Sequence, residues 1–534
     1  MLNNVFEGLS TPAIEYISGL ENKVDKMQNQ INLLTELLIK ANKDKFGPSS
    51  EKMKYILSDE FLQETLFNEA EAFADENAPG PVIVEKHTRR PKRTKEELAK
   101  DLPVEEVIHD LPEDRRFCDI CDTALREIGR EFLRRELNFI PAQAYVTENY
   151  RVNYCCDCCA AETDDAKIIK AEVPEPVVKR GLASPSSVAH VMYQKYVNAV
   201  PLYRQEKDWE TFGVKISRAT LANWIIYTGN HWLAPLWNAL KALLLECMVI
   251  LADETVTQVL KEPGKTPQSK SRMWVYCTGN VPRAPPIVLF EYQPTRSGQH
   301  PKEFLKGIEK PFYLHTDGYA GYNAVVNAIH AGCWGHLRRK FEEAMPKNAP
   351  KDNKARIGFE YCQKLFMLER EYVDLNPDQR VDKRSEKSKP VVDAFYGWIG
   401  TLNPLAGSNL AKAVTYAVNQ KAHLSTFLLD GCIEISTNRV ENKIRAFATG
   451  RKNWLFADTV AGAKASAVAY SIIGTAVANG LNPYEYLKYL FTTLPTVLAK
   501  DPDVDLSPYF PWVDEIQEKC KFAQGAKGQL SLLG

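Results

Sequence analysis

Long hydrophobic runs and an excess of either charge are both missing from this chain. No stretch of the 534 residues approaches the roughly 18 consecutive apolar residues that a membrane-spanning helix requires. The first residues, MLNNVFEGLSTPAIEYI, contain no basic start followed by an apolar run, so the sequence predicts neither export nor a membrane anchor. The formal net charge is -1, so any attraction for nucleic acid must come from local positive charge.

Bulk composition selects no special class of protein. Hydrophobic residues make up 45% and charged residues 25% of the chain, which is ordinary for a soluble globular protein and excludes global disorder. The length is too great for one ordinary core, so about three or four structural units are expected.

Six of the 12 cysteines are clustered, which favours metal binding in a reducing cytosol over a disulfide scaffold. Cys118 and Cys121 form one pair, and the CCDCC run at 155–159 supplies a second. Four thiolates make a closed tetrahedral zinc site, which is structural rather than catalytic. The second pair is either Cys156 with Cys159 or Cys155 with Cys158, since both have the same spacing. Unrelated buried cysteines are the alternative interpretation.

The N-terminal segment carries apolar residues in alternating steps of three and four. They are Ile17, Leu20, Val24, Met27, Ile31, Leu34 and Leu38. This is the seam of a coiled coil, and its β-branched positions favour two parallel strands and hence self-association. An amphipathic helix packed on its own chain is the alternative.

A linker with a basic segment follows the predicted coiled coil. KFGPSSE at 45–51 ends the helix, and an acidic stretch leads into PGP at 79–81. KHTRRPKRTK at 86–95 then places six basic residues in ten, among them Arg89, Arg90, Lys92 and Arg93. Such a run suits a DNA phosphate backbone, although a solvated linker has the same composition.

Short helices are expected over 183–230, and the last opens at Ser217 as a helix cap. The turn FGV at 212–214 followed by SRATL is typical of a helix-turn-helix with a recognition helix. An all-helical packing module without DNA contacts fits the spacing equally well.

From 247 onward the pattern changes to short apolar runs typical of strands. They are CMVILA at 247–252, MWVYC at 273–277, IVLF at 287–290 and FYLH at 312–315. A helix-like crossover at 300–307 precedes the fourth run, which predicts a mixed sheet with helices against it. Residues 338 to about 430 read as a charged helical insertion, and CIEI at 432–435 as a brief return of sheet.

Three separated acids are candidate metal ligands. Asp253 and Asp317 each follow an apolar strand, and Glu441 lies on a helix capped by Thr437 or Asn438. Carboxylates that share one cleft suit magnesium, which keeps coordination positions open for substrate phosphates. Two metal ions about 3.5 to 4 Å apart promote displacement at a phosphodiester. The acids alone are weak evidence in a chain with 68 Asp and Glu.

Positive residues near the third acid are candidate DNA contacts. Arg445 is one turn beyond Glu441, and Arg451 and Lys452 follow an expected helix end at Gly450 with a tryptophan beside them. His336, in CWGHLRRKF, is read either as a proton relay or phosphate contact or as hydrogen-bonded structure.

Taken together, these strings resemble the transposases of the insertion sequence 66 family, a branch of the DDE transposases. The resemblance covers nearly the whole chain. It is carried by KFGPSSEK at 45–52, the cysteine pairs, GLASPS at 181–186, KYV at 195–197, PLYRQ at 201–205, ADET at 252–255, TDGYAGYN at 316–323, CWGH at 333–336, NRVEN at 438–442 and GRKNWLF at 450–456.

The resemblance implies a multidomain α+β protein with a ribonuclease-H-like mixed sheet as its catalytic core. The implied order is a coiled coil at 14–44, a linker with the basic segment at 45–105, a zinc-binding module at 106–175, a helix-turn-helix-like DNA-binding domain at 183–240, the first part of the core at 245–340, a helical insertion at 341–430, the last part of the core at 431–480 and a C-terminal helical tail at 481–534.

The resemblance also implies roles for single residues. Asp253, Asp317 and Glu441 become the catalytic acids that hold Mg²⁺ or Mn²⁺, and Cys118, Cys121, Cys156 and Cys159 the zinc ligands. The implied reaction is cleavage at each transposon end, followed by attack of the 3′-hydroxyl on target DNA, and it needs no covalent protein intermediate.

The implied partners are transposon-end and target DNA, a second copy of the chain and accessory proteins of the same element, in the bacterial cytoplasm at the nucleoid. The rival interpretations are a metal-dependent, structure-specific nuclease on the same core and a DNA-binding regulator with an inactive core.

Overall fold

The structure is a computed structural model that describes residues 19, 23, 24, 27, 144–155, 168–346 and 348–522. The four positions near the N-terminus are helical. The rest of the predicted coiled coil, the linker, the basic segment and the cysteines at 118, 121, 156 and 159 lie outside the described residues.

The helices and strands of the described residues lie between 153 and 519. In chain order they are β1 (Asn153–Cys155), β2 (Ile168–Lys170), α7 (Pro185–Tyr196), α8 (Leu202–Thr211), α9 (Arg218–Thr228), η2 (Gly229–Leu233), α10 (Ala234–Leu245), β3 (Val249–Lys261), β4 (Lys270–Thr278), β5 (Val288–Gln293), α11 (Gln299–Phe304), β6 (Phe312–Thr316), η3 (Ala320–Ala324), β7 (Ala328–Gly332), α12 (Trp334–Ala344), α13 (Lys354–Glu371), α14 (Pro377–Lys383), η4 (Arg384–Ser388), α15 (Lys389–Ile399), α16 (Asn409–Asn419), α17 (Lys421–Ser425), η5 (Thr426–Leu428), α18 (Asn438–Trp454), β8 (Ala457–Thr459), α19 (Val460–Ala478), α20 (Pro483–Lys500), η6 (Ser507–Tyr509) and α21 (Asp514–Lys519). The mixed α+β class predicted from the sequence is confirmed.

The main sheet has the strand order β5-β4-β3-β6-β7, and β8 pairs separately with β3. Strand β4 runs antiparallel to both β3 and β5, whereas β6 is parallel to β3 and β7 is parallel to β6. The crossover between β5 and β6 contains α11, as the sequence predicts, because two parallel strands need a connection that crosses the sheet. The sequence predicts β3 to β6 and misses the short strands β7 and β8.

Helix α19 covers the edge strand β5. The Ser471 hydroxyl accepts from Phe290 N at 2.7 Å, and the Thr475 hydroxyl accepts from Val288 N at 3.0 Å. These bonds occupy backbone groups that an open sheet edge would offer to another chain. Among the described residues, α19 is long and apolar enough to cross a membrane by length and composition alone, but 56% of its most apolar window is buried inside the structure. Its contacts with β5 are those of a core helix.

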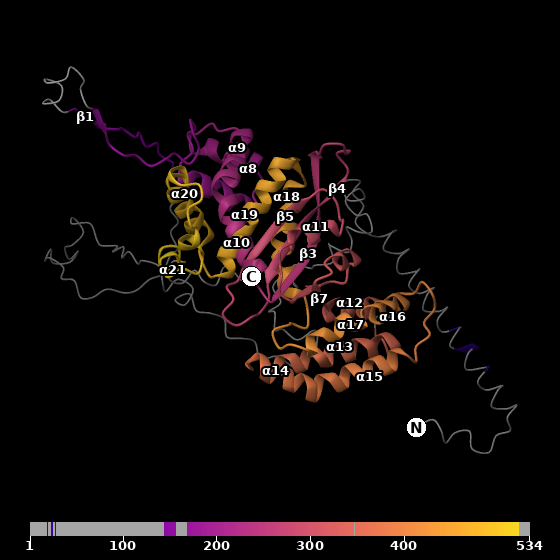
Figure 1. The fold of residues 1–534 in the computed structure, drawn as a ribbon. Helices are drawn as coiled ribbons and strands as arrows, with labels where there is room; N and C mark the ends of the chain where they lie inside the picture. The colour runs from indigo at the N-terminus through magenta and orange to yellow at the C-terminus, as the bar shows by residue number, and fades with distance from the viewer. Residues whose placement is uncertain are drawn as a thin grey trace, which may run out of the picture.

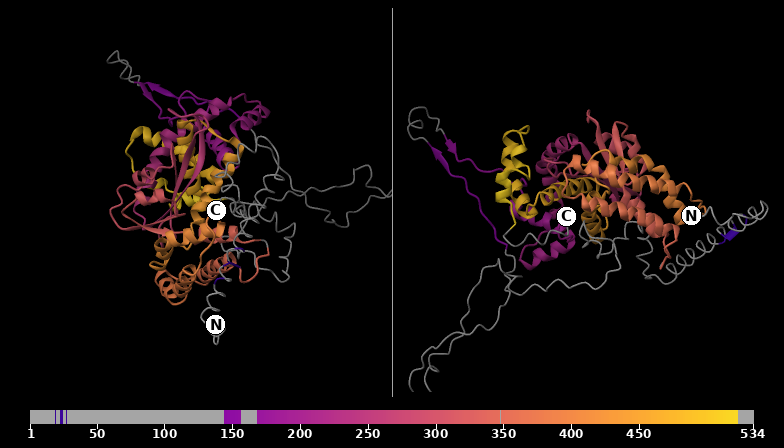
Figure 2. Two further views of the ribbon diagram at one scale, coloured as in Figure 1. Left: turned by 90° about the vertical axis from the view of Figure 1, so that its right-hand side faces the viewer. Right: turned by 90° about the horizontal axis from the view of Figure 1, so that it is seen from below.

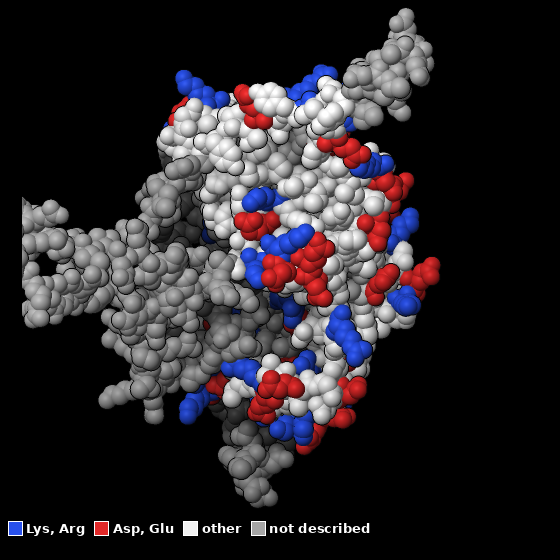
Figure 3. Space-filling model, turned by 90° about the vertical axis from the view of Figure 1, so that its left-hand side faces the viewer, with Lys and Arg blue, Asp and Glu red and all other residues white. Residues whose placement is uncertain are grey.

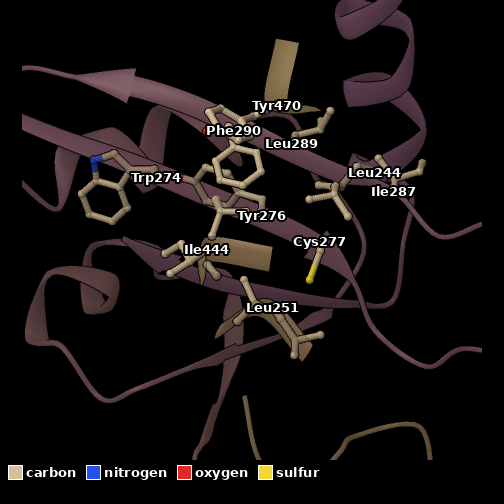
Figure 4. Packing of buried hydrophobic residues seen from close by; sticks show 14 of the residues in the cluster. Leu244, Leu251, Trp274, Tyr276, Cys277, Ile287, Leu289, Phe290, Ile444 and Tyr470 are labelled. Atoms are coloured by element: carbon tan, nitrogen blue, oxygen red, sulfur yellow. The ribbon is translucent and has the colours of Figure 1, made fainter. Parts of the chain in front are cut away.

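Helix α18 packs against the central strands of the sheet. Ile444 lies among the sheet side chains, between Tyr276 of β4 and Leu251 of β3 (Figure 4). Burial of such side chains contributes about 1.5 to 3 kcal/mol each, so this contact fixes the helix against the sheet.

The helices α7 to α10 pack beside the sheet and share its core with α19 and α20 (Figures 1 and 2). Ser217 caps α9 as predicted, because its side chain accepts from Thr220 N at 3.2 Å. The turn before it contains Gly213 at φ +79°, a conformation that favours glycine. Arg218, Ala219 and Thr220 at the start of α9 are exposed.

The helices α12 to α17 gather on one side of the sheet, away from α8, α9 and α20 (Figure 1). Helices α13 to α17 lie within 341–430, the stretch in which a helical insertion is predicted, whereas α12 begins before it. The fully buried Arg384 joins this layer to the segment before α18, since its guanidinium donates to the carbonyls of Phe427, Asp430 and Ile433.

The predicted strand at 432–435 is wrong. The structure shows turns and bends there, although Cys432, Ile433 and Ile435 are buried. Their apolar character reflects burial in a loop, in which the Ile433 carbonyl accepts from Arg384 and the Ile435 carbonyl accepts from Trp334 N. The backbone carbonyls of this loop are thus satisfied by a side chain and by a single backbone N–H, instead of by the hydrogen bonds of a neighbouring strand.

Candidate active site

Asp253 lies within β3 rather than at its end, which corrects the sequence-based placement. It is the fifth residue of a strand that runs from Val249 to Lys261. Strand β6 pairs with β3 only at 249–251, and β8 pairs with it from Val259. Asp253 therefore lies on the part of β3 between these two pairings, where this edge of the strand pairs with neither β6 nor β8.

Asp317 directly follows β6, as predicted. Its Oδ1 accepts from Tyr319 N at 2.8 Å, and its carbonyl accepts from the Tyr416 hydroxyl at 2.7 Å. Gly318 has φ +92°, and a Cβ there would meet Gln420. The loop that carries the second acid is therefore held by Tyr416 of helix α16 and by Gln420, the residue that follows this helix.

Glu441 lies in the first turn of α18, on a helix as predicted. The Thr437 hydroxyl donates to Glu441 Oε1 at 3.0 Å, so it binds this carboxylate instead of capping the helix. Arg339 Nη2 lies 3.2 Å from Oε2, and His336 Nδ1 lies 3.6 Å from Oε1. Both cationic residues come from α12, which follows β7.

The structure brings the three acids into one electrostatic neighbourhood. Burial raises the pKa of Asp253 well above its ordinary value, and the charges of Asp317, Glu254 and Glu441 raise it further. Burial also raises the pKa of Glu441, but His336 and Arg339 outweigh this and hold it below its ordinary value. The pKa of Glu254 rises to about 7, through burial and then the charge of Asp317.

The residues at this site fit a divalent cation. Buried carboxylates that repel one another are stabilised by a bound cation, and hard cations prefer oxygen ligands. Among the described residues, however, the group whose ligand atoms all lie within 4.8 Å of one another is Cys333, His336 and Glu441. Glu441 is thus turned toward α12, where cations compensate its charge.

The sequence left the role of His336 open and assigned no role to Arg339. The structure instead places both against Glu441. Burial lowers the pKa of His336, but Glu441 and Cys333 raise it more, to about 10, so the imidazole is charged in this arrangement. The i, i+3 spacing of Cys333, His336 and Arg339 indicates that these side chains share one helix face, and this was the feature of the sequence that could have grouped them.

The predicted DNA contacts near Glu441 fall in different environments. Arg445 is half-buried, and Lys452 is exposed. Arg451 is buried, with Nη1 at 3.4 Å from the Thr255 hydroxyl. The helix continues through Gly450 to Trp454, so the expected end at Gly450 is wrong. Trp454 is partly buried, and the Lys195 ammonium lies over its ring, 4.3 Å from the ring centroid.

Surface charge is mixed on the face shown in Figure 3. Lysine and arginine side chains lie among aspartate and glutamate side chains there, in keeping with the net charge of -1. Four of the predicted DNA-binding residues, Arg89, Arg90, Lys92 and Arg93, lie outside the described residues.

Models of known families match four parts of the chain. The Transposase IS66 family matches residues 180–465, and the IS66 C-terminal element matches 471–506. The zinc-finger binding domain of transposase IS66 matches 115–160, and a model described as Transposase C of IS166 homeodomain matches 33–107.

These matches define the chain as a transposase. The first model spans more than half of the residues, from 180 to 465, and the chain belongs to the IS66 transposase family. The zinc-finger match spans all the clustered cysteines and confirms a zinc-binding module in that region. The homeodomain match covers the whole predicted linker and the end of the predicted coiled coil, and together with the family it implies DNA as a partner.

Curated relatives align over most of their length. An uncharacterized protein of Sinorhizobium fredii, y4qI, is 29% identical over 507 residues, which cover 92% of this chain and 90% of the relative. A second, y4hP, from the same organism, is 26% identical over 524 residues, covering 93% of this chain and 88% of the relative.

Proposed function

We propose that this transposase binds the ends of an insertion sequence and catalyses metal-dependent phosphodiester cleavage and strand transfer into target DNA. The observation that carries the proposal is the convergence of Asp317 and Glu441 on Asp253. Their charges both raise the pKa of buried Asp253, although the three acids come from a loop, a helix and a strand. The separations are 317 − 253 = 64 and 441 − 317 = 124 residues, so only folding brings them together.

The topology of the sheet supports a ribonuclease-H-like core. Three antiparallel strands lead to two parallel ones in the order β5-β4-β3-β6-β7, and α18 packs on the central strands. In this proposal the core runs from β3 to β7 and resumes at α18, with α13 to α17 as the helical insertion.

Asp253, Asp317 and Glu441 would hold Mg²⁺ or Mn²⁺. When bound, such ions activate the attacking oxygen and stabilise the leaving oxygen in a phosphodiester displacement. The chain's own residues position the acids: Tyr319 N and the Tyr416 hydroxyl hold the Asp317 loop, and His336 pairs with the Glu441 carboxylate.

DNA recognition is assigned to three parts of the chain. We place transposon-end binding on the basic segment and on the zinc module, with Cys118, Cys121, Cys156 and Cys159 as the zinc ligands. The exposed start of α9 would enter the major groove as a recognition helix does. Self-association through the N-terminal coiled coil would pair two ends, with accessory proteins of the element joining at the bacterial nucleoid.

A strand-transfer assay with the full-length protein, end DNA and Mg²⁺ or Mn²⁺ tests this function. The expected result is cleavage at the element end and a joined product with target DNA. Cleavage without joining would make the protein a nuclease instead. Specific end binding without any metal-dependent chemistry, equal in wild type and Asp253→Asn, would make it a regulator.

A further inference from the structure

Glu254, next to Asp253, has both carboxylate oxygens occupied by protein donors. Its side chain is 1% exposed. Arg296 Nε donates to Oε1 at 2.6 Å, and the Tyr322 hydroxyl donates to Oε2 at 2.7 Å. A buried carboxylate is costly unless it is paired in this way. Glu254 therefore acts as an anchor for Arg296 and Tyr322, separate from the three candidate metal ligands.

Arg296 is fixed from three directions. Its Nε is bound to Glu254, its guanidinium lies 4.0 Å from the centroid of the Tyr319 ring, and its carbonyl accepts from the Tyr319 hydroxyl. Within the described part of the chain, the side-chain hydrogen bonds of Arg296 use Nε and leave both Nη groups available. The side chain is 42% exposed, so these Nη groups can meet a ligand.

The Arg296 loop packs directly against the loop of the second acid. Gly298 approaches Gly321 so closely that a Cβ at 298 would lie 2.2 Å from the Gly321 carbonyl oxygen. Tyr319, which stacks on Arg296, also donates its backbone N to Asp317 Oδ1. Thr295 and Ser297 on either side of Arg296 are exposed and carry hydroxyl groups.

A charged fork with free Nη donors, held rigid beside hydroxyl groups, suits a phosphate. Arginine binds phosphate oxygens in a bidentate manner, and a preorganised guanidinium loses little side-chain entropy on binding. An arginine whose only role was to neutralise Glu254 would have no need of a stacked, outward-facing guanidinium.

We propose that Arg296 binds a backbone phosphate of the DNA next to the phosphate that is cut, with Glu254 and Tyr319 as the residues that orient it. This inference rests on the proposed function. It adds a phosphate-binding site on the β5–α11 loop to the three acids, and it explains the buried Glu254 beside Asp253.

The test uses full-length Arg296→Ala and, as a matched control, Lys302→Ala, which removes an exposed positive charge from neighbouring α11. Binding to end DNA is measured in magnesium-free buffer, with single phosphates near the cleavage position replaced by neutral methylphosphonates. Arg296→Ala should weaken binding about tenfold. In wild type one flanking methylphosphonate should cost affinity, and in Arg296→Ala the same replacement should cost none.

Equal losses in Arg296→Ala and Lys302→Ala, with the same methylphosphonate profile as wild type, would overturn the proposal. Arg296→Lys guards against a folding defect, because it keeps the charge and lacks the fork; it should bind more weakly than wild type with an unchanged melting temperature. If wild type itself fails to bind end DNA, the proposed function fails first and this site fails with it.

Discussion

Replacing the buried Arg384 by methionine should destabilise the helical insertion strongly. The side chain is fully buried and donates five hydrogen bonds, two to Glu369 at 2.8 and 2.6 Å and three to backbone carbonyls at 2.6, 2.8 and 2.9 Å. Removing one partner of a buried ion pair costs about 3 to 5 kcal/mol, because the remaining charge stays buried without compensation. The three carbonyls would lose their donor as well, so we expect the upper part of that range.

The loss should be measured by urea unfolding and by hydrogen exchange of the insertion helices. Lys383→Met is the matched control, since Lys383 is the preceding residue and its ion pair with Glu386 is half exposed. Such surface pairs contribute about 0 to 1 kcal/mol. The double variant Arg384→Met/Glu369→Met should recover part of the stability, because it leaves no unpaired charge. A loss for Arg384→Met no larger than for Lys383→Met would refute the reasoning.

The remaining predictions concern the acids, the sheet edge and the zinc module. Burial and neighbouring carboxylates raise the pKa of Asp253 in the folded state. The contribution of Asp253 to the free energy of unfolding is therefore complete below its unfolded-state pKa and is lost as the pH rises through its folded-state pKa. The melting temperature in magnesium-free buffer should therefore fall with rising pH more in wild type than in Asp253→Asn, and equal slopes would contradict this. Ser471→Val should cost about 1 to 3 kcal/mol, because Phe290 N loses its acceptor, whereas the exposed Thr492→Ala should change little in the same melts. Cys118→Ser should lower the bound zinc measured by atomic absorption, and unchanged zinc would remove Cys118 from the ligand set.

The sheet could be predicted wherever apolar side chains form runs bounded by turns. MWVYC at 273–277 and FYLH at 312–315 lie in β4 and β6. Strand β7, with the sequence AIHAG, has small residues and no such pattern, so only its pairing with β6 defines it. CIEI at 432–435 has the pattern and forms no strand, because Arg384 is distant in sequence and supplies the donor that a neighbouring strand would have supplied.

The sequence proposes which residues form the candidate site but says little about the surroundings of each one. Family motifs single out Asp253, Asp317 and Glu441, and the structure places their charges close enough to interact. Local sequence gives no information on which side chains reach Glu441 from another helix. The contacts of Glu441 with His336 and Arg339 depend on how α12 packs beside α18, which is a property of the tertiary fold.

The central claim is that these three carboxylates carry the chemistry, and single-turnover cleavage of end DNA by full-length variants tests it most directly. Asp253→Asn, Asp317→Asn and Glu441→Gln should each bind end DNA as wild type does and show no cleavage in Mg²⁺ or Mn²⁺. Asp393→Asn, at an exposed acid paired with Lys389, should cleave normally. Wild-type cleavage by any of the three variants would contradict the assignment of that acid.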